Sequence, residues 1–234
     1  SLSNMQPTTI VLFGGTGDLT KRKLIPAFAT LVRQGKLTRD SLLIGVGRRM
    51  LTHEAYRQSL VEGLSDEDRA ALATFHILYF QDDVGEQESL TRLPAFLQTH
   101  ERSQSNRIFY LATSYTLFPA IAQRLAAVNL AEHPGGWTRI VFEKPFGHDL
   151  ASSDALDSAI HKIFPEEALF RIDHYLAKET AQNLQVLKFA NPFFDHLFYH
   201  SLLSHIEIIV DESLGVGNRL GYYATTGAVK DMLQ

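Results

Sequence analysis

Residues 171–179, Arg-Ile-Asp-His-Tyr-Leu-Ala-Lys-Glu, gather a carboxylate, an imidazole, a phenol and an ammonium group in one short run. If this run is helical, His174 and Lys178 lie four residues apart on one face, and Tyr175 lies three residues before Lys178. All three side chains can then converge on one phosphate group, and a helix N-terminus adds partial positive charge. Asp173 precedes this face and is placed to orient a partner histidine. The run predicts an anion-binding site, and the competing interpretation is an ordinary charged helix surface.

A second motif is the glycine-rich segment 14–19, which reads Gly-Gly-Thr-Gly-Asp-Leu. It follows a predicted strand at 9–13 and precedes a segment of helical spacing, which is the setting of a dinucleotide-binding turn. Backbone amides at the helix start would donate to pyrophosphate oxygens, and the absent side chains of Gly14 and Gly17 would make room for them. The alternative is a tight turn that serves packing alone.

The end of the second predicted strand, residues 42–46, indicates which dinucleotide is bound. NAD-binding proteins usually carry an acidic residue there for the ribose 2′-hydroxyl, whereas this chain has Arg48 and Arg49 after Gly47. Two guanidinium groups can hold a 2′-phosphate. The pattern favours NADP over NAD, and the alternative is that both arginines are solvated loop charges.

A third motif, Glu143-Lys144-Pro145, follows the predicted strand 139–142. Ligands of open α/β sheets gather at the carboxyl ends of the strands, so Lys144 should face the cleft and hold a substrate hydroxyl or the cofactor. Glu143 could be its ion-pair partner. Pro145 restricts Lys144 to an extended backbone and could itself follow a cis peptide bond.

Short apolar runs alternate with segments of helical spacing along most of the chain, which predicts strands alternating with helices. The predicted strands are residues 9–13, 42–46, 75–80, 107–112 and 139–142, and the predicted helices are residues 19–34, 53–63, 86–99, 116–129 and 150–163. Pro26 is unfavourable inside a helix, so the first helix is expected to kink or to begin late. The alternation predicts an α/β fold with a doubly wound, mostly parallel sheet of the Rossmann type.

Toward the C-terminus the pattern changes to helices at 177–190 and 192–199 and a strand at 204–210 with one polar face. A segment of about sixty residues can hardly complete a sheet of its own. We therefore predict a dinucleotide-binding domain, residues 1–173, followed by the truncated start of a second domain, residues 174–234, which the resemblance given below makes an α+β substrate domain.

Composition excludes several classes of function. The net charge of -4 gives no general attraction to nucleic acid or to anionic membranes, and the chain has no cysteine for disulfides, thiolate metal sites or a thiol nucleophile. No apolar run is long enough to span a bilayer. The histidines show no spacing typical of a metal site, so no metal is expected.

Glu212 and Asp231 are acids able to bind sugar hydroxyls, although surface charge is the commoner role of such residues.

Three motifs together resemble the glucose-6-phosphate dehydrogenases: Gly-Gly-Thr-Gly-Asp-Leu-Thr-Lys at 14–21, Glu-Lys-Pro-Phe-Gly at 143–147 and the run at 171–179. The segments Asn-Arg-Leu-Gly-Tyr-Tyr and Gly-Ala-Val-Lys-Asp-Met-Leu-Gln near the end extend the resemblance over nearly the whole chain. It implies oxidation of glucose 6-phosphate to 6-phosphogluconolactone with hydride transfer to NADP, the first step of the pentose phosphate pathway. It also implies a cytoplasmic protein that is a homodimer or tetramer at full length.

The resemblance also implies roles for single residues. The cofactor site would comprise Gly14, Gly15, Thr16, Gly17, Asp18, Leu19, Thr20, Lys21, Arg48 and Lys144. The substrate site would comprise Lys144, lying between cofactor and substrate, His174, Tyr175 and Lys178 at the sugar phosphate, and Glu212 and Asp231 at the sugar. Asp173 would orient the catalytic histidine.

In the family, Asn-His follows the segment Lys-Asp-Met-Leu-Gln, and that histidine is the base that removes the C1 hydroxyl proton. The sequence ends at Gln234, before this position, and family members are about twice as long. We therefore expect NADP to bind while turnover is negligible, because loss of a general base alone costs about 10²–10⁴-fold in rate.

Two other functions stay open. One is a different NADP oxidoreductase with a Glu-Lys-Pro motif, against which the run at 171–179 argues. The other is a noncatalytic NADP-binding sensor, for which 234 residues would be the natural length.

Overall fold

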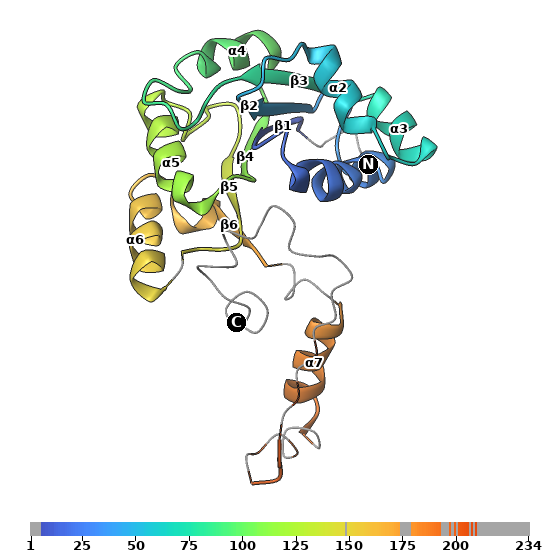
Figure 1. The fold of residues 1–234 in the computed structure, drawn as a ribbon, viewed down its shortest axis with the longest axis vertical. Helices are drawn as coiled ribbons and strands as arrows, with labels where there is room; N and C mark the ends of the chain where they lie inside the picture. The colour runs from blue at the N-terminus through green and yellow to red at the C-terminus, as the bar shows by residue number, and fades with distance from the viewer. Residues whose placement is uncertain are drawn as a thin grey trace. The chain divides into compact units, whose positions relative to one another are not determined.

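The computed structural model describes residues 6–147, 149–173 and 179–192 and a few positions between 197 and 209. The chain divides into two compact units, Ser1–Ile172 and Asp173–Gln234. The first unit contains the sheet and the helices that flank it (Figure 1). None of the described helices is both long enough and apolar enough to span a bilayer.

The sheet of the first unit has six strands, all parallel, in the order β3-β2-β1-β4-β5-β6. The strands are β1 Thr8–Phe13, β2 Leu42–Gly47, β3 His76–Gln81, β4 Asn106–Leu111, β5 Thr138–Glu143 and β6 Leu169–Ile172. The chain moves outward from β1 to β3 and then returns to the other side of β1 for β4. Between β1 and β4 the order reverses, and this is where sheets of this kind bind their ligands. The doubly wound, Rossmann-type sheet is confirmed.

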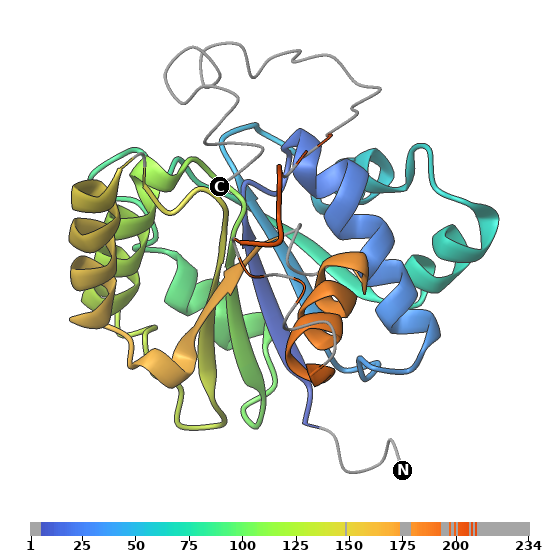
Figure 2. The same ribbon diagram turned by 90° about the horizontal axis from the view of Figure 1, so that it is seen from below.

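Helices cover both faces of this sheet, as Figure 2 shows. One face carries α1 Ile25–Arg33, α2 His53–Val61 and α3 Asp66–Ala73, and the other carries α4 Leu93–His100, α5 Phe118–Ala127 and α6 Leu150–His161. Short helices of other types are η2 Thr20–Leu24, η3 Tyr115–Leu117 and η4 Glu166–Ala168. Because both faces are covered, β1 and β2 are buried along almost their whole length and are apolar without alternation.

The first helix begins with a wide turn. Residues 20–24 form a π-helix in which the amide of Ile25 donates to the carbonyl of Thr20, and the regular helix α1 starts only at Ile25. Pro26 has no amide hydrogen, and its ring would clash with the carbonyl four residues earlier in a regular α-helix. The wide turn removes this clash, so the expectation of a late start at Pro26 is confirmed.

The segment between β3 and β4 differs from the prediction. The helix predicted at 86–99 is wrong over its first half, because residues 83–92 form turns and α4 begins only at Leu93. Pro94 is in the first turn of α4, where its missing amide is tolerated, and Leu90 has a positive φ of 67°. Helix α3 was not predicted, although Ser65 caps it by accepting a hydrogen bond from the amide of Asp68 at 3.2 Å.

In the second unit the described helix is α7, Glu179–Phe189, which agrees with the helix predicted at 177–190. Residues 177 and 178 lie outside the described residues. The helix predicted at 192–199 also falls largely outside them. Of the strand predicted at 204–210, positions 204, 205, 207 and 209 are described, and none of these four is in a strand.

A buried ion pair joins Arg107, near the start of β4, to Glu101 just after α4, at the amino end of the sheet. The guanidinium of Arg107 donates to both carboxylate oxygens of Glu101, with Nη2–Oε2 at 2.5 Å and Nε–Oε1 at 3.2 Å. The two side chains are only 6% and 5% exposed. Such a pair stabilises little in itself, but either partner alone would be a buried, uncompensated charge.

We therefore expect Arg107→Met to lower the free energy of unfolding by about 3–5 kcal/mol, because Glu101 keeps its charge and loses its partner. Urea denaturation measures this loss. The matched control is Arg102→Ala, which breaks the exposed pair with Asp40 at 3.0 Å and should cost about 0–1 kcal/mol. A loss no larger for Arg107→Met than for the control would contradict the assignment.

Candidate functional site

The glycine-rich turn lies where β1 ends and η2 begins, as the sequence predicts. Its first amide, that of Gly15, donates to the carbonyl of Val46 on β2 at 2.9 Å, which fixes the turn to the neighbouring strand. The carbonyl of Gly14 accepts two hydrogen bonds at 2.9 Å, from the amide of Gly17 and from the hydroxyl of Thr20. The turn is therefore closed by its own hydrogen bonds.

The first two glycines of the turn are required by contacts within the protein. Gly14 has a φ of +80°, and a Cβ atom there would lie 2.5 Å from the backbone oxygen of Ala112 after β4. At Gly15 a Cβ atom would lie 2.7 Å from the Cα atom of Gly45 on β2. We expected the absent side chain of Gly14 to make room for a phosphate. In the structure it makes room for the backbone of Ala112, just after β4. Gly17 is less crowded, since its Cβ would meet the Gly14 carbonyl at 3.1 Å.

Arg48 and Arg49 follow β2 directly, and both side chains are exposed. The turn and this segment touch through Gly47, where a Cβ atom would lie 3.2 Å from Oγ1 of Thr16. The structure thus brings the glycine-rich turn and the two arginines together, as the cofactor prediction requires. The residues at and after the end of the turn differ in their surroundings: Thr20 is fully buried, Lys21 is half-buried, and Asp18 is exposed and ion-paired with Arg22 at 3.4 Å.

The Glu143-Lys144-Pro145 motif lies at the carboxyl end of β5, the same edge of the sheet as the glycine-rich turn. The peptide bond between Lys144 and Pro145 is cis, and Lys144 is half-buried. Glu143 is 5% exposed and accepts a hydrogen bond from the hydroxyl of Tyr110 on the adjacent strand β4. Burial, together with this bond and the charge of Glu143, raises the pKa of Tyr110, so its hydroxyl stays a donor. The Glu-Lys-Pro segment is therefore fixed from β4 as well as from β5.

Tyr110 was not predicted as part of the site. The available signal was its place in an otherwise apolar strand, Ile108 to Leu111, where a buried phenol needs a partner. Asp173 directly follows β6 and is half-buried. The other residues predicted at the substrate, His174, Tyr175, Lys178, Glu212 and Asp231, lie outside the described residues.

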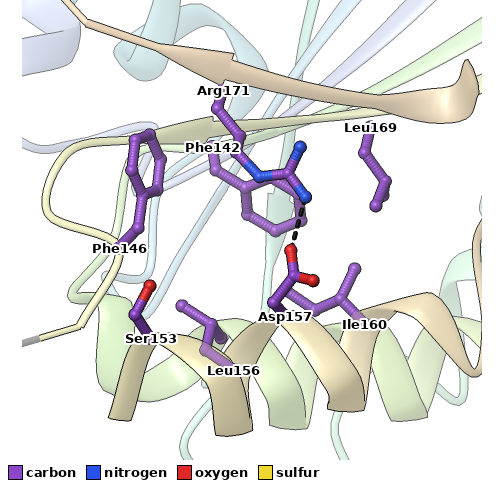
Figure 3. Close-up of a pocket in the computed structure, with 8 residues that line it drawn as sticks. All are labelled: Phe142, Phe146, Ser153, Leu156, Asp157, Ile160, Leu169 and Arg171. Carbon is purple, nitrogen blue, oxygen red and sulfur yellow. Dashed lines mark hydrogen bonds and ion pairs between the residues drawn. The ribbon is translucent and has the colours of Figure 1, made fainter. Parts of the chain in front are cut away.

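A small cavity of about 110 Å³ lies between α6 and the strands β5 and β6 (Figure 3). Its walls are largely apolar side chains such as Phe142, Phe146 and Leu156, and Arg171 reaches across it to Asp157 on α6. The Arg171–Asp157 distance is 2.5 Å, and Arg171 also pairs with Glu166 at 3.1 Å. These ion pairs join Arg171 on β6, the first residue of the run at 171–179, to α6 and to η4.

His161 completes this surface cluster. Its ring contacts the backbone carbonyl of Asp157 at 2.9 Å and the carboxylate of Glu166 at 2.7 Å. The carbonyl contact and then the Glu166 contact raise the pKa of His161, and Arg171 followed by His161 lowers the pKa of Glu166. The folded protein therefore favours the protonated imidazole more than the unfolded chain does.

The glycine contacts predict different costs for two substitutions at positive φ. Gly14→Ala should destabilise the protein by about 3 kcal/mol or more and weaken dinucleotide binding, because backbone strain of about 1–2 kcal/mol adds to a steric clash with Ala112. The control is Gly63→Ala, at φ +81° with nothing within 4 Å of the added Cβ. It should cost only the strain of about 1–2 kcal/mol, as measured by urea denaturation. Equal costs at the two positions would contradict the packing role of Gly14.

The raised pKa of His161 predicts a pH dependence of stability. Its contribution is fully present below the unfolded-state pKa of about 6.5 and is lost as pH rises through the higher folded-state value. His161→Gln should therefore reduce the decline in unfolding free energy above that pH. His133, whose pKa burial and Arg107 lower, should behave in the opposite sense, and His133→Gln should reduce a rise in stability with pH. The effect of His133 falls below the unfolded-state pKa of about 6.5 and that of His161 above it, so denaturation curves are measured on both sides of that pH. If both variants changed the slope in the same direction relative to wild type, the assignment would be refuted.

Comparisons with known proteins agree with this arrangement. Residues 11–183 match the family model of the glucose-6-phosphate dehydrogenase NAD binding domain, and residues 185–234 match that of the C-terminal domain. Glucose-6-phosphate 1-dehydrogenase of Bacillus subtilis (strain 168) is 40% identical over 99% of this chain and 48% of its own length. The enzyme of the same name from Aggregatibacter actinomycetemcomitans is 39% identical over 96% of this chain and 47% of its own length.

Solved structures agree as well. A glucose-6-phosphate dehydrogenase in complex with its substrate glucose 6-phosphate superposes with a TM-score of 0.79 at 29% identity, over 97% of this chain and 49% of that one. The enzyme of Mycobacterium avium superposes with a TM-score of 0.78 at 30% identity, over 98% of this chain and 49% of that one. The chain spans about half the length of the relatives it matches. On these matches and on its fold, the chain belongs to the glucose-6-phosphate dehydrogenase family.

Proposed function

We propose that this chain provides the NADP-binding part of an enzyme that oxidises glucose 6-phosphate to 6-phosphogluconolactone. The observation that carries the proposal is the contact between the glycine-rich turn and the segment of Arg48 and Arg49, at the point where the strand order reverses. A dinucleotide needs both features close together, one for its diphosphate and one for its adenosine ribose. NADP supplies the hydride acceptor, and the protein residues bind and orient it.

The residues present fit NADP. The turn uses the amides of Gly15 and Gly17 in its own hydrogen bonds, so the diphosphate would be bound by other amides of the turn, such as that of Thr16. Arg48 and Arg49 are exposed at the end of β2, and the sequence there contains no carboxylate that would repel a 2′-phosphate. Exposed guanidinium groups beside the turn support NADP rather than NAD.

Lys144 would lie between the cofactor and the sugar, because it occupies the end of β5 on the cofactor edge of the sheet. Holding the sugar hydroxyl next to the nicotinamide is a positional task, and Tyr110 and Glu143 support it by fixing the lysine's backbone. On the substrate side we propose His174, Tyr175 and Lys178 for the sugar phosphate. Glu212 and Asp231 would bind the sugar, and Asp173 would orient a catalytic histidine.

We also propose that the dinucleotide-binding domain covers residues 1–173 and that the substrate domain begins at 174. The division of the chain at Ile172 supports this boundary, whereas the family models divide about ten residues later, between 183 and 185. The two alternatives, another Glu-Lys-Pro oxidoreductase and a noncatalytic NADP sensor, are not favoured, because both halves of the chain match glucose-6-phosphate dehydrogenase models.

Calorimetric titration of the purified protein with NADP and with NAD tests the proposal. NADP should bind more tightly than NAD, and joint replacement Arg48→Ala and Arg49→Ala should raise the Kd for NADP about 10–100-fold while leaving that for NAD nearly unchanged. Each charge-assisted hydrogen bond to the 2′-phosphate contributes about 1.5–3 kcal/mol, and 1.4 kcal/mol corresponds to tenfold. Only the dinucleotide with this phosphate loses these bonds.

Arg102→Ala is the control for charge, because Arg102 precedes β4 at the opposite edge of the sheet. The NADP-loaded protein should also bind glucose 6-phosphate and not glucose, since the proposed grip is on the phosphate. Tighter binding of NAD than of NADP, or no effect of the double replacement, would refute the cofactor assignment.

A further inference from the structure

Two tyrosines lie beneath the proposed cofactor site, and each donates a hydrogen bond to the backbone of one of its two segments. Tyr79, on β3, donates from its hydroxyl to the carbonyl of Arg49 at 2.8 Å. Tyr56, on α2, donates to the carbonyl of Gly15 in the glycine-rich turn at 3.0 Å. The two rings pack against each other, with centroids 4.8 Å apart and an interplanar angle of 36°.

We infer that Tyr79 is a positioning residue for the choice between NADP and NAD, because it fixes the backbone that carries Arg48 and Arg49. The inference rests on the proposed function. It names a determinant of specificity that contacts neither the guanidinium groups of the two arginines nor the dinucleotide. Tyr56 has the parallel task for the diphosphate, which both dinucleotides share.

Glycines on β2 create the space for these hydroxyls. A Cβ atom at Gly45 would lie 2.0 Å from the hydroxyl of Tyr56, and one at Gly47 would lie 2.9 Å from the hydroxyl of Tyr79. Both phenols can therefore pass directly over the strand and reach the segment beyond it. If β2 carried side chains at Gly45 and Gly47, the two hydroxyls could not reach the carbonyls of Gly15 and Arg49 in this way.

The tyrosines are well suited to act as fixed donors. Tyr56 and Tyr79 are both buried, at 0% and 3% exposure, so few other conformations are open to their rings. Burial raises the pKa of both tyrosines. The neighbouring Tyr79 raises the pKa of Tyr56 further, whereas Arg49 opposes the rise at Tyr79. Both hydroxyls thus stay protonated at neutral pH and keep donating.

The position of β3 itself is also fixed. The backbone amide of Tyr79 donates to Nδ1 of His53 at the start of α2 at 3.0 Å, and β3 pairs with β2 along its whole length. The amide of Asp82, just after β3, donates to the carbonyl of Gly47 at 3.0 Å. The hydroxyl of Tyr79 is therefore a reference point that does not move with the exposed arginine side chains.

The two contacts have different consequences for binding. Without the hydroxyl of Tyr79, the peptide group of Arg49 can rotate. The backbone to which the two guanidinium side chains are attached is then no longer fixed. This affects only a ligand that the guanidinium groups hold, namely one with a 2′-phosphate. Without the hydroxyl of Tyr56, the glycine-rich turn is loosened, and this affects any dinucleotide diphosphate equally.

The experiment compares Tyr79→Phe with Tyr56→Phe in the purified protein, with Kd values for NADP and NAD measured by calorimetry. Tyr79→Phe should raise the Kd for NADP about 5–10-fold and that for NAD less than about twofold, as loss of one hydrogen bond of about 1 kcal/mol or somewhat more implies. Tyr56→Phe should raise both Kd values by the same factor, so that their ratio is unchanged.

A double-mutant comparison separates positioning from a general structural effect. In the protein that also carries Arg48→Ala and Arg49→Ala, Tyr79→Phe should no longer change the ratio of Kd values. Thermal unfolding of each variant checks that it is folded.

An unchanged ratio in Tyr79→Phe, with wild type still preferring NADP, would overturn this inference and leave the proposed function standing. An equal change of the ratio with and without the two arginines would also overturn it. If wild type bound neither dinucleotide, or preferred NAD, the proposed function would fail and this inference with it.

Discussion

The close contact of three backbone segments at the end of β1 is the constraint on which the rest of the first unit depends. There the glycine-rich turn lies directly on β2 through Gly15 and Gly45, and Gly14 lies against the chain after β4. A side chain at Gly14 or Gly15 would push apart backbone segments that lie in direct contact, and one at Gly45 would collide with the ring of Tyr56. Because this is also the point where the strand order reverses, the packing that closes the sheet creates the edge where a dinucleotide binds.

The arrangement around this point combines rigid and exposed parts. The backbone of the turn and of the segment after β2 is fixed by hydrogen bonds that Tyr56 and Tyr79 donate and by the bond that the carbonyl of Val46 accepts from Gly15. Arg48 and Arg49, in contrast, extend into solvent. At the other side of β1, the hydroxyl of Tyr110 fixes Glu143 next to Lys144. Charged groups for a ligand are thus attached to a backbone that needs no rearrangement to receive it, which is the physical meaning of preorganisation.

Much of this fold could be predicted from sequence, because its signals are local. Apolar runs predicted β1 to β5 but not β6, and Pro26 predicted the late start of α1. The errors arose where local signals were weak: α3 buries little apolar surface apart from Leu72, and Leu90 adopts a positive φ that nothing in its side chain favours. Motif spacing correctly placed the glycine-rich turn after β1 and the two arginines after β2, while their part in binding stays a prediction. It could not reveal Tyr56, Tyr79 or Tyr110, because their partners are 41, 30 and 33 residues away in sequence.

The alternation of glycine along β2 has a consequence for how this sequence can change. Gly45 leaves the space that the phenol of Tyr56 fills, and Gly47 leaves the space for that of Tyr79. Each glycine and its tyrosine therefore form one steric unit, although the two residues are distant in sequence. Neither member of a unit can be enlarged alone. A larger residue at 45 or 47 becomes tolerable only after the facing aromatic has been shortened, and the shortening first leaves a void under the turn. We therefore expect evolutionary change at these positions to occur by paired substitutions, in which the tyrosine changes first and the glycine second.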